Sequence, residues 1–278
     1  MQNSKGSMLD RLLSVAACTF LVLAACSPNS PASGALAFTE WNIDPDQPND
    51  IAFGADGMLF VTINNSHRVV GYDANGQQTA EWMVEGEPAA LASGPGGQIY
   101  VTINNSHRVV GYSPDGHVLA DWGVDGQPTG LAVGPGGEVY VTINNSHRVV
   151  GYSPDGRVIT DWPVDGQTAG IAVGPNGEIY VTINNSHRVA QFSANGEWLA
   201  EWDVDGEPGL LAVGAEGEVF VTINNSHRVV AYSPTGDFLT EWNLEEDALG
   251  IAAGPGGRVF VTINNSHRVV NLTCASCP

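Results

Sequence analysis

Short runs of alternating apolar and polar residues, separated by clusters of Gly, Pro, Asn and Asp, fill most of the chain. One representative stretch contains four such runs, Gly130–Val133, Glu138–Ile143, His147–Tyr152 and Arg157–Trp162. Alternation with β-branched residues is typical of half-buried strands, and Gly-Pro clusters interrupt strands. The pattern therefore predicts four consecutive strands, a to d, joined by tight turns. We expect Asn144-Asn145-Ser146 to form the b–c turn, because Asn tolerates the left-handed conformation of tight hairpins.

This unit recurs through the chain without drift. The string Val-Thr-Ile-Asn-Asn-Ser-His-Arg-Val begins at six positions that are 40 residues apart, namely Val61, Val101, Val141, Val181, Val221 and Val261. Four strands in about 40 residues, repeated, are the signature of a β-propeller blade. The sequence predicts an all-β protein, a six-bladed propeller of four-stranded antiparallel blades.

The two ends of the repeat region complement each other. Residues Ala37–Trp41 match the strand d segment Phe238–Trp242, whereas the last repeat stops at Leu272, after strand c. We therefore expect the N-terminal strand to supply the outer strand of the last blade, which closes the ring and leaves no open blade edge.

The repeated string, followed by an aromatic residue and Ser-Pro-Asp-Gly, resembles the NHL repeat over Phe38–Leu272. The resemblance implies a propeller, and similar propellers serve as sensor domains, as RNA or protein binders, and as metal-dependent lyases and lactonases. The chain departs from the family pattern where Ile stands in place of an Asp, at Ile63, Ile103, Ile143, Ile183, Ile223 and Ile263.

The charge balance is strongly acidic, with 30 acidic against 10 basic residues and a net charge of −20. Nucleic-acid binding needs stripes of Lys and Arg, so we expect no nucleic-acid partner, and an anionic membrane surface would repel the domain. A protein, a glycan or a cationic ligand fits better, and we expect a monomer.

The N-terminus has the pattern of a targeting segment. Lys5 and Arg11 precede an apolar run that is too short to span a membrane and ends in Leu23-Ala24-Ala25-Cys26. That ending resembles the lipobox of bacterial lipoproteins, which implies cleavage before Cys26 and lipidation of its thiol; ordinary signal cleavage is the alternative. We expect a signal peptide over 1–25, a lipidated Cys and tether over 26–36, the propeller over 37–272 and a tail over 273–278. The protein would then be lipid-anchored in the cell envelope, at the outer membrane or facing the periplasm in a Gram-negative organism and otherwise on the outer surface.

The topology of a four-stranded blade places the b–c turns and the d–a connections on one face. The predicted binding residues of this face are Asn64, His67, Asn104, His107, Asn144, His147, Asn184, His187, Asn224, His227, Asn264, His267, Asp125, Asp165 and Asp205. Amides, imidazoles and carboxylates together suit a cationic or hydroxyl-rich ligand.

Metal binding is a weaker expectation. Equivalent His residues of a six-bladed ring lie too far apart to share one Zn²⁺, although a His could pair with an acid of its own d–a loop. The stretch Asp203–Glu207 has alternating oxygens but not the 12-residue loop of a strong Ca²⁺ site. We predict no cofactor, with Ca²⁺ or Zn²⁺ as the open alternative.

Two other repeated or paired features have structural interpretations. If Pro-Asp-Gly forms a three-residue loop between strands c and d, the register of the hairpin pairs Arg108 with Trp122. This pairing would allow a cation–π contact. At the tail, Cys274 and Cys277 suggest an intramolecular disulfide in an oxidising compartment, with free or intermolecular thiols as the alternative.

Three classes of function fit these features. The first is a non-enzymatic binding or interaction scaffold on the cell surface, the second is a metal-assisted lyase or lactonase of the NHL-like type, and the third is recent duplication with little selected function. Enzymes concentrate chemistry in one asymmetric site, whereas these loops are nearly identical and show no single catalytic cluster. We therefore predict the binding scaffold and no catalytic residues, with the lyase or lactonase as the alternative.

Overall fold

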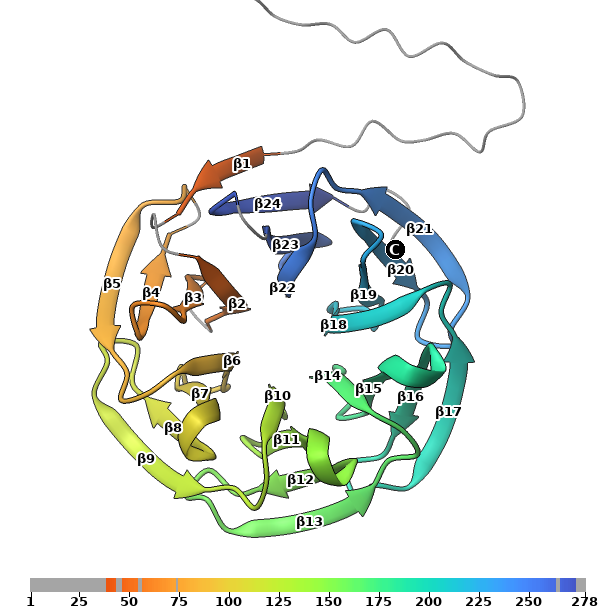
Figure 1. The fold of residues 1–278 in the computed structure, drawn as a ribbon, viewed down its shortest axis with the longest axis horizontal. Helices are drawn as coiled ribbons and strands as arrows, with labels where there is room; N and C mark the ends of the chain where they lie inside the picture. The colour runs from red at the N-terminus through yellow and green to blue at the C-terminus, as the bar shows by residue number, and fades with distance from the viewer. Residues whose placement is uncertain (1–38, 44–46, 55–56, 74, 264–265, 274–278) are drawn as a thin grey trace, which may run out of the picture. The chain divides into compact units, whose positions relative to one another are not determined.

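Six four-stranded antiparallel sheets surround a central axis as the blades of a propeller (Figure 1). The computed structural model describes residues 39–43, 47–54, 57–73, 75–263 and 266–273, and within residues 39–41 it describes the backbone alone. The six-bladed, four-stranded architecture predicted from the repeat is confirmed.

Each blade runs from an inner strand a at the axis to an outer strand d at the rim. Blade 1 consists of β2 (Pro48–Phe53), β3 (Leu59–Ile63), β4 (Arg68–Tyr72) and β5 (Gln78–Met83). Blade 2 consists of β6 (Pro88–Ser93), β7 (Ile99–Ile103), β8 (Arg108–Tyr112) and β9 (Val118–Gly123). Blade 3 consists of β10 (Pro128–Val133), β11 (Val139–Ile143), β12 (Arg148–Tyr152) and β13 (Val158–Pro163).

The other three blades follow the same order. Blade 4 consists of β14 (Thr168–Val173), β15 (Ile179–Ile183), β16 (Arg188–Phe192) and β17 (Trp198–Asp203). Blade 5 consists of β18 (Glu207–Val213), β19 (Val219–Asn224), β20 (Arg228–Tyr232) and β21 (Phe238–Asn243). Blade 6 consists of β22 (Ala248–Gly254), β23 (Arg258–Ile263), β24 (Arg268–Thr273) and, as its outer strand, β1 (Thr39–Asn42).

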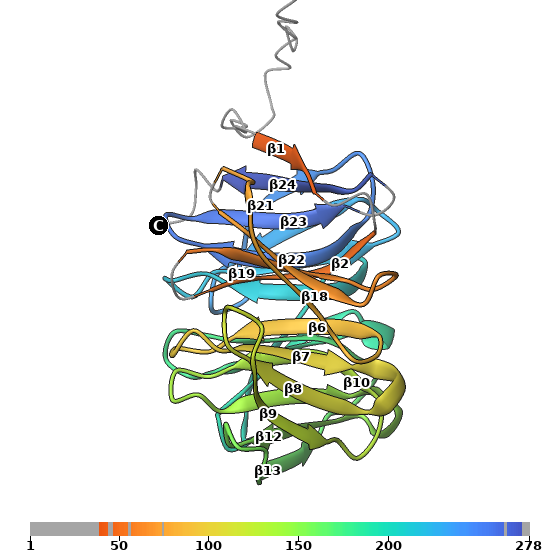
Figure 2. The same cartoon turned by 90° about the vertical axis from the view of Figure 1, so that its left-hand side faces the viewer.

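The ring closes as the chain ends predicted. Strand β1 pairs antiparallel with β24 in the register Thr39↔Asn271 to Asn42↔Arg268. Both ribbon views place β1 outside β24 (Figures 1 and 2). The outer edge of β24 is therefore covered by a strand that comes from the other end of the sequence.

Aromatic residues fill the space between blades. The Trp122 ring of strand d lies 6.1 Å from Tyr100 of its own blade and 5.8 Å from Tyr152 of the next. Gly156 lies against the same indole, where an added Cβ would come within 2.7 Å of the ring. The Trp and the turn glycine of the next blade are thus one packing unit, which recurs at Gly116, Gly196 and Gly236.

A buried threonine of strand b joins neighbouring blades near the axis. A β-bulge interrupts the pairing of strand a with strand b, as between Pro88 and Leu91. At this bulge Thr102 Oγ1 accepts the Ala90 N–H at 2.8 Å. The equivalent Thr62 donates to Ala89 O of the next blade at 3.1 Å. These two threonines therefore satisfy backbone groups that the ladder leaves open, whereas Thr142 Oγ1 pairs with the hydroxyl of Thr129.

The predicted pairing of Arg108 with Trp122 is wrong by one residue. Arg108 faces Gly123, and Trp122 faces Val109. The cause is a β-bulge between Gly111 and Tyr112, which adds one residue to strand d and shifts every pair beyond it.

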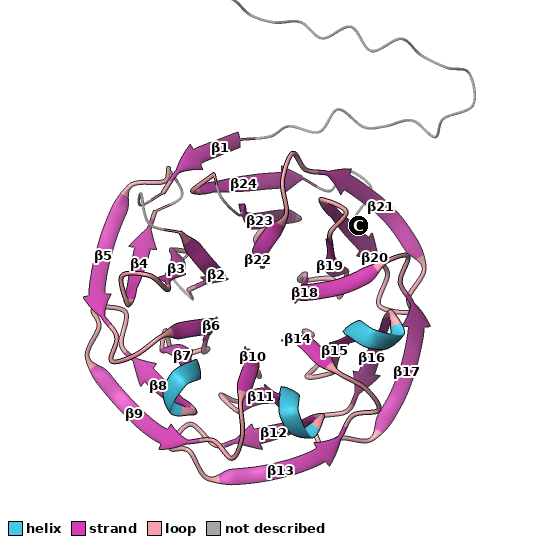
Figure 3. Cartoon of the chain, viewed as in Figure 1, coloured by secondary structure: helices cyan, strands magenta, loops and turns pink. Residues whose placement is uncertain are grey.

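The b–c turn also differs from its prediction in one respect. In blades 2, 3 and 4, the Asn-Asn-Ser segments form single 3₁₀ turns, coloured as helices in Figure 3: η1 (Asn104–Ser106), η2 (Asn144–Ser146) and η3 (Asn184–Ser186). The residue in the left-handed region is the following histidine, with φ of 50° at His107 and 48° at His147. In blade 5, Asn225 adopts a left-handed φ of 59° as well. His shares with Asn and Asp the ability to take this conformation, which explains why it can end the turn.

Several predictions fall outside the described residues. These concern the signal segment, Cys26, the tether, Asn264, Cys274 and Cys277, and they stay predictions. In the described part of the chain, no helix has the length and apolar character that a membrane span requires.

Candidate functional site

The Asn side chains and the His backbone of the predicted binding face make hydrogen bonds within the ring. Asn185 Oδ1 accepts the Gln167 N–H of the d–a connection at 2.9 Å. Asn184, the first Asn of the turn, donates from Nδ2 to Pro208 O of the next blade at 3.3 Å. The second Asn thus fixes its own blade, and the first Asn connects two blades.

The histidines of this face use their backbone to hold the d–a connection. The Val124 N–H donates to His107 O at 2.7 Å, which extends the pairing of strands c and d. The side chains of His67, His107, His147, His187 and His227 are exposed, and His267 is partly buried. One imidazole faces an acid, with His227 Nε2 3.6 Å from Asp247 Oδ1.

The predicted carboxylates pair with the repeated arginine. Arg148 binds Asp125 at 2.9 Å, binds Asp161 of strand d at 2.8 Å, and donates from Nε to Ser146 Oγ at 3.0 Å. The equivalent pairs are Arg188 with Asp165 and Arg228 with Asp205. Each arginine therefore connects two blades and the b–c turn, and its partner is a carboxylate rather than an indole.

These residues form six repeated clusters and not one common site. Within the described ranges, no three His, Cys, Asp or Glu side chains are placed to hold a metal ion. Asp125, Asp165 and Asp205 have fully exposed side chains, at 98, 103 and 96%. Their ion pairs are worth about 0.2–1 kcal/mol each, as is typical of surface pairs.

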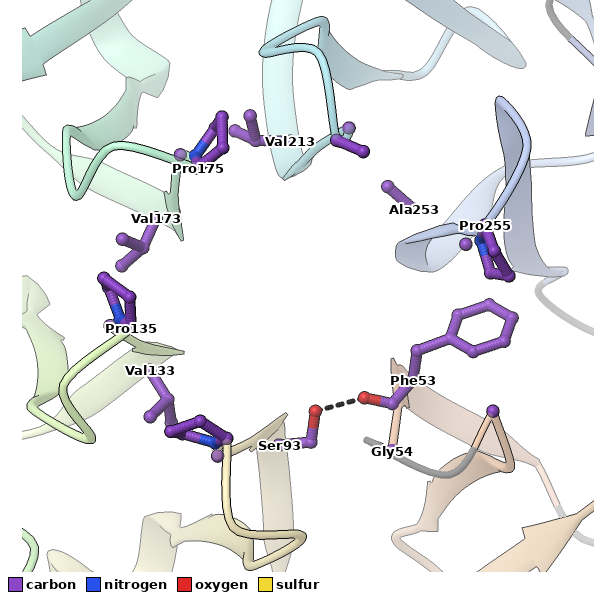
Figure 4. Close-up of a pocket in the computed structure, with 18 residues that line it drawn as sticks. Phe53, Gly54, Ser93, Val133, Pro135, Val173, Pro175, Val213, Ala253 and Pro255 are labelled. Carbon is purple, nitrogen blue, oxygen red and sulfur yellow. Dashed lines mark hydrogen bonds between the residues drawn. The ribbon is translucent and has the colours of Figure 1, made fainter.

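The axis of the propeller carries a cavity of about 570 Å³. It opens between the a–b turns, and one residue at the end of strand a in each blade lines it: Phe53, Ser93, Val133, Val173, Val213 and Ala253. Figure 4 shows the valines and the turn prolines around the opening, with Ser93 Oγ donating a hydrogen bond to Phe53 O. This axial funnel is mostly apolar.

Nearer the beginning of strand a, the space along the axis narrows to about 50 Å³. One carboxylate, that of Asp50, lines this space. Asp50 Oδ2 accepts the Leu91 N–H of blade 2 at 3.0 Å, and Oδ1 accepts the Ile51 N–H at 2.9 Å. On the other side, Gly250 of blade 6 approaches so closely that its Cβ would lie 2.8 Å from Asp50 Cα. Asp50 thus lies where blades 1, 2 and 6 meet.

Burial dominates the ionisation of Asp50. Removal of the carboxylate from water raises its pKa from 3.8 to about 7. The hydrogen bonds from the backbone N–H groups of Leu91 and Ile51 lower the pKa, but their effect is smaller than that of burial. A carboxyl group with this pKa exists in both protonation states near neutral pH. It can therefore take up or release a proton, as general acid–base catalysis requires.

The sequence contained this signal, although the search for repeated motifs missed it. At the two positions where blade 1 has Asn49-Asp50, the other blades have Ala89-Ala90, Thr129-Gly130, Ala169-Gly170, Gly209-Leu210 and Leu249-Gly250. Position-by-position comparison of the six copies would have identified Asp50 as the one ionisable residue at these two positions. Motif searching emphasised what the copies share, whereas this site is a difference between them.

The fold of this propeller is similar to that of several solved enzymes. The chain superposes on a streptogramin B lyase with a TM-score of 0.68, 16% identity and coverage of 86% of this chain and 97% of the other. Virginiamycin B lyase from Staphylococcus aureus gives a TM-score of 0.67 at 14% identity, covering 86 and 99%. A gluconolactonase from Xanthomonas campestris gives 0.71 at 16% identity, covering 86 and 90%. At such identities the similarity shows the fold alone.

The sequence comparison is more specific. A search of curated proteins gave no match. The profile of the Virginiamycin B lyase family matches residues 36–198, which is more than half of the sequence and includes Asp50. The chain therefore belongs to the virginiamycin B lyase family.

Proposed function

We propose that the protein is a lyase-type enzyme whose reaction takes place over the axis of the propeller, with Asp50 as its proton acceptor. The observation that carries the proposal is the position of Asp50, the one ionisable side chain that lines the narrow axial space, with a pKa of about 7. Family membership supports this class of reaction over a scaffold role. A substrate would lie at the end of the axis where strand a begins, two residues before Asp50.

A lyase breaks a bond by elimination, and Asp50 would supply the base for that step. Its carboxylate would remove a proton from a carbon next to a carbonyl group of the substrate. The electron pair of that C–H bond forms a C=C bond, and the neighbouring C–O bond breaks with its pair on the departing oxygen. An ester oxygen leaves as a carboxylate and needs no proton, so Asp50 then releases its proton to water.

The metal assistance implied by the sequence resemblance has no matching ligand set in the described residues. Both oxygens of Asp50 already accept backbone N–H groups, and no cluster of three His, Cys, Asp or Glu side chains is present in those ranges.

The test is turnover of two probe compounds by the full chain. One is quinupristin, the ligand in a structure of the S. aureus enzyme inactivated by a His-to-Ala substitution, and the other is gluconolactone. We expect conversion of quinupristin with a rate that rises with pH through about 7, and a loss of at least 100-fold in Asp50→Asn. Asp203→Asn, at an exposed aspartate of β17, is the matched control and should retain the rate.

The result also distinguishes the alternatives. Equal rates for wild type and Asp50→Asn, or no conversion of quinupristin by the wild type, contradict the proposal. Conversion of gluconolactone alone would indicate a lactonase.

A second candidate is cation binding on the face of the b–c turns and d–a connections. It is favoured by the exposed carboxylates of Asp125, Asp165 and Asp205, each beside a neighbouring blade. Titration with spermidine tests it, since triple replacement by Asn should abolish the binding. The Asp50→Asn variant should bind spermidine as the wild type does.

A further inference from the structure

A smaller cavity lies beside the axial funnel, between blades 5 and 6. It has a volume of about 140 Å³ and is lined by the a–b turns of the two blades, with Glu216, Glu218, Phe220 and Arg258 among its residues. Gly214, Ala215, Ala253 and Gly254 line both this cavity and the funnel, so the two spaces are neighbours. Figure 1 shows the two blades side by side, with β18 of blade 5 next to β22 of blade 6.

One wall of this cavity is a buried carboxylate. Glu218 is only 3% exposed, whereas its copies Glu138 and Glu178 are intermediate in burial. Its side chain forms no ion pair within the described part of the chain. A buried charge without a counter-charge is costly, so a cationic group that entered the cavity would bind favourably.

The opposite wall carries a guanidinium that is unique among the repeats. Arg258 occupies the position that is Met58, Gln98, Glu138, Glu178 and Glu218 in the other blades.

Local contacts hold Arg258 in its own blade. Nε donates to Pro255 O at 3.2 Å, and the guanidinium carbon lies 5.6 Å from the centre of the Phe260 ring. Arg258 and Glu218 therefore present opposite charges to one cavity without an ion pair between them.

We propose that this cavity binds a small zwitterion, namely an amino acid with a small side chain. Its ammonium group would pair with Glu218 and its carboxylate with Arg258, whose planar guanidinium suits carboxylate recognition. The cavity volume of about 140 Å³ restricts the ligand to a small molecule, because drug-sized ligands occupy about 300–1,000 Å³. The junction of blades 4 and 5 has glutamate on both sides at this position and would repel the carboxylate.

The experiment is calorimetric titration of the full chain with L-alanine and glycine. Methylammonium and acetate, which each carry one of the two charges, are the fragment probes. We expect L-alanine to bind at least tenfold more tightly than either fragment, and Glu218→Gln and Arg258→Gln each to weaken it at least tenfold. Glu178→Gln, the same position in blade 4, is the matched control and should leave binding unchanged.

Several results would overturn the assignment. These are a wild type that binds neither amino acid, a Glu218→Gln protein that binds as the wild type does, or equal weakening in the Glu178→Gln control. If Glu218→Gln does not fold, Arg258→Gln decides alone, because its side chain is less buried. Asp50→Asn should bind L-alanine normally, so the outcome is independent of the proposed reaction.

Discussion

Replacing Asp50 by Asn should change how the stability of the propeller depends on pH. In the folded protein, burial raises the pKa of Asp50 to about 7, whereas the unfolded chain has the ordinary value of 3.8. At a pH between these two pKa values, Asp50 is protonated in the folded state and ionised in the unfolded state. The wild type should therefore lose stability as the pH rises from about 4 to about 7.

The magnitude follows from the two pKa values. Each tenfold difference in proton affinity corresponds to about 1.36 kcal/mol, so the interval from 3.8 to about 7 gives at most about 4 kcal/mol. The asparagine of the variant would not titrate, and its amide oxygen can still accept one of the two N–H groups. The free energy of unfolding of the wild type minus that of the variant should thus fall by about 1.4 kcal/mol per pH unit over this range and level off above pH 7.

Urea unfolding at half-unit pH steps from about 4 to about 8.5 measures this difference directly. Subtraction of the variant removes the contribution of the other acidic groups, which both proteins share. For a chain of this size a difference of about 4 kcal/mol corresponds to roughly 8–16 °C in Tm. A difference that stays constant within about 0.5 kcal/mol over the whole range would show that Asp50 ionises as an ordinary aspartate and would refute the reasoning.

Three further predictions concern the frame of the ring. His147→Val should cost roughly 1–2 kcal/mol, because φ is +48° there, whereas His147→Asn should be nearly neutral in thermal unfolding. Gly156→Ala should cost about 1–3 kcal/mol, since its Cβ would meet the indole of the preceding blade at a φ of +84°, whereas Gly123→Ala, with open space around it, should melt as the wild type does. Deletion of Thr39–Asn42 should expose β24, lower the Tm and promote association in sedimentation, so an unchanged monomer would contradict the closure.

The fold could be derived from the sequence because its signals are local and repeated six times. Each strand has an apolar alternation and each turn has its own Gly, Pro or Asn. A strand or turn that is ambiguous in one repeat is therefore identified by the equivalent segments of the other repeats. What could not be derived was the register of strands c and d. The bulge beside Gly111 depends on backbone twist and packing rather than on a recognisable turn residue.

The candidate site was harder to predict for a different reason. The His and Asn residues of the b–c turns were predicted as ligands because they are polar and repeated, and the structure shows hydrogen-bond partners for Asn side chains and for the His backbone. The raised pKa of Asp50 depends on burial at the axis by blades 2 and 6, which are far away in sequence. A single aspartate in an inner strand does not indicate this burial until the ring is closed.

The contrast between repeated and unrepeated residues suggests where function should be sought in such a protein. A residue that builds a blade or joins it to the next is needed in every blade, and the string Val-Thr-Ile-Asn-Asn-Ser-His-Arg-Val contains residues of both kinds. Its Thr bonds strand a, its His ends the turn and its Arg joins adjacent blades. A ligand on the axis meets all six blades at once, so six identical side chains would give it no orientation. Orientation of a ligand on the axis requires that one blade differ from the others, as blade 1 does at Asp50.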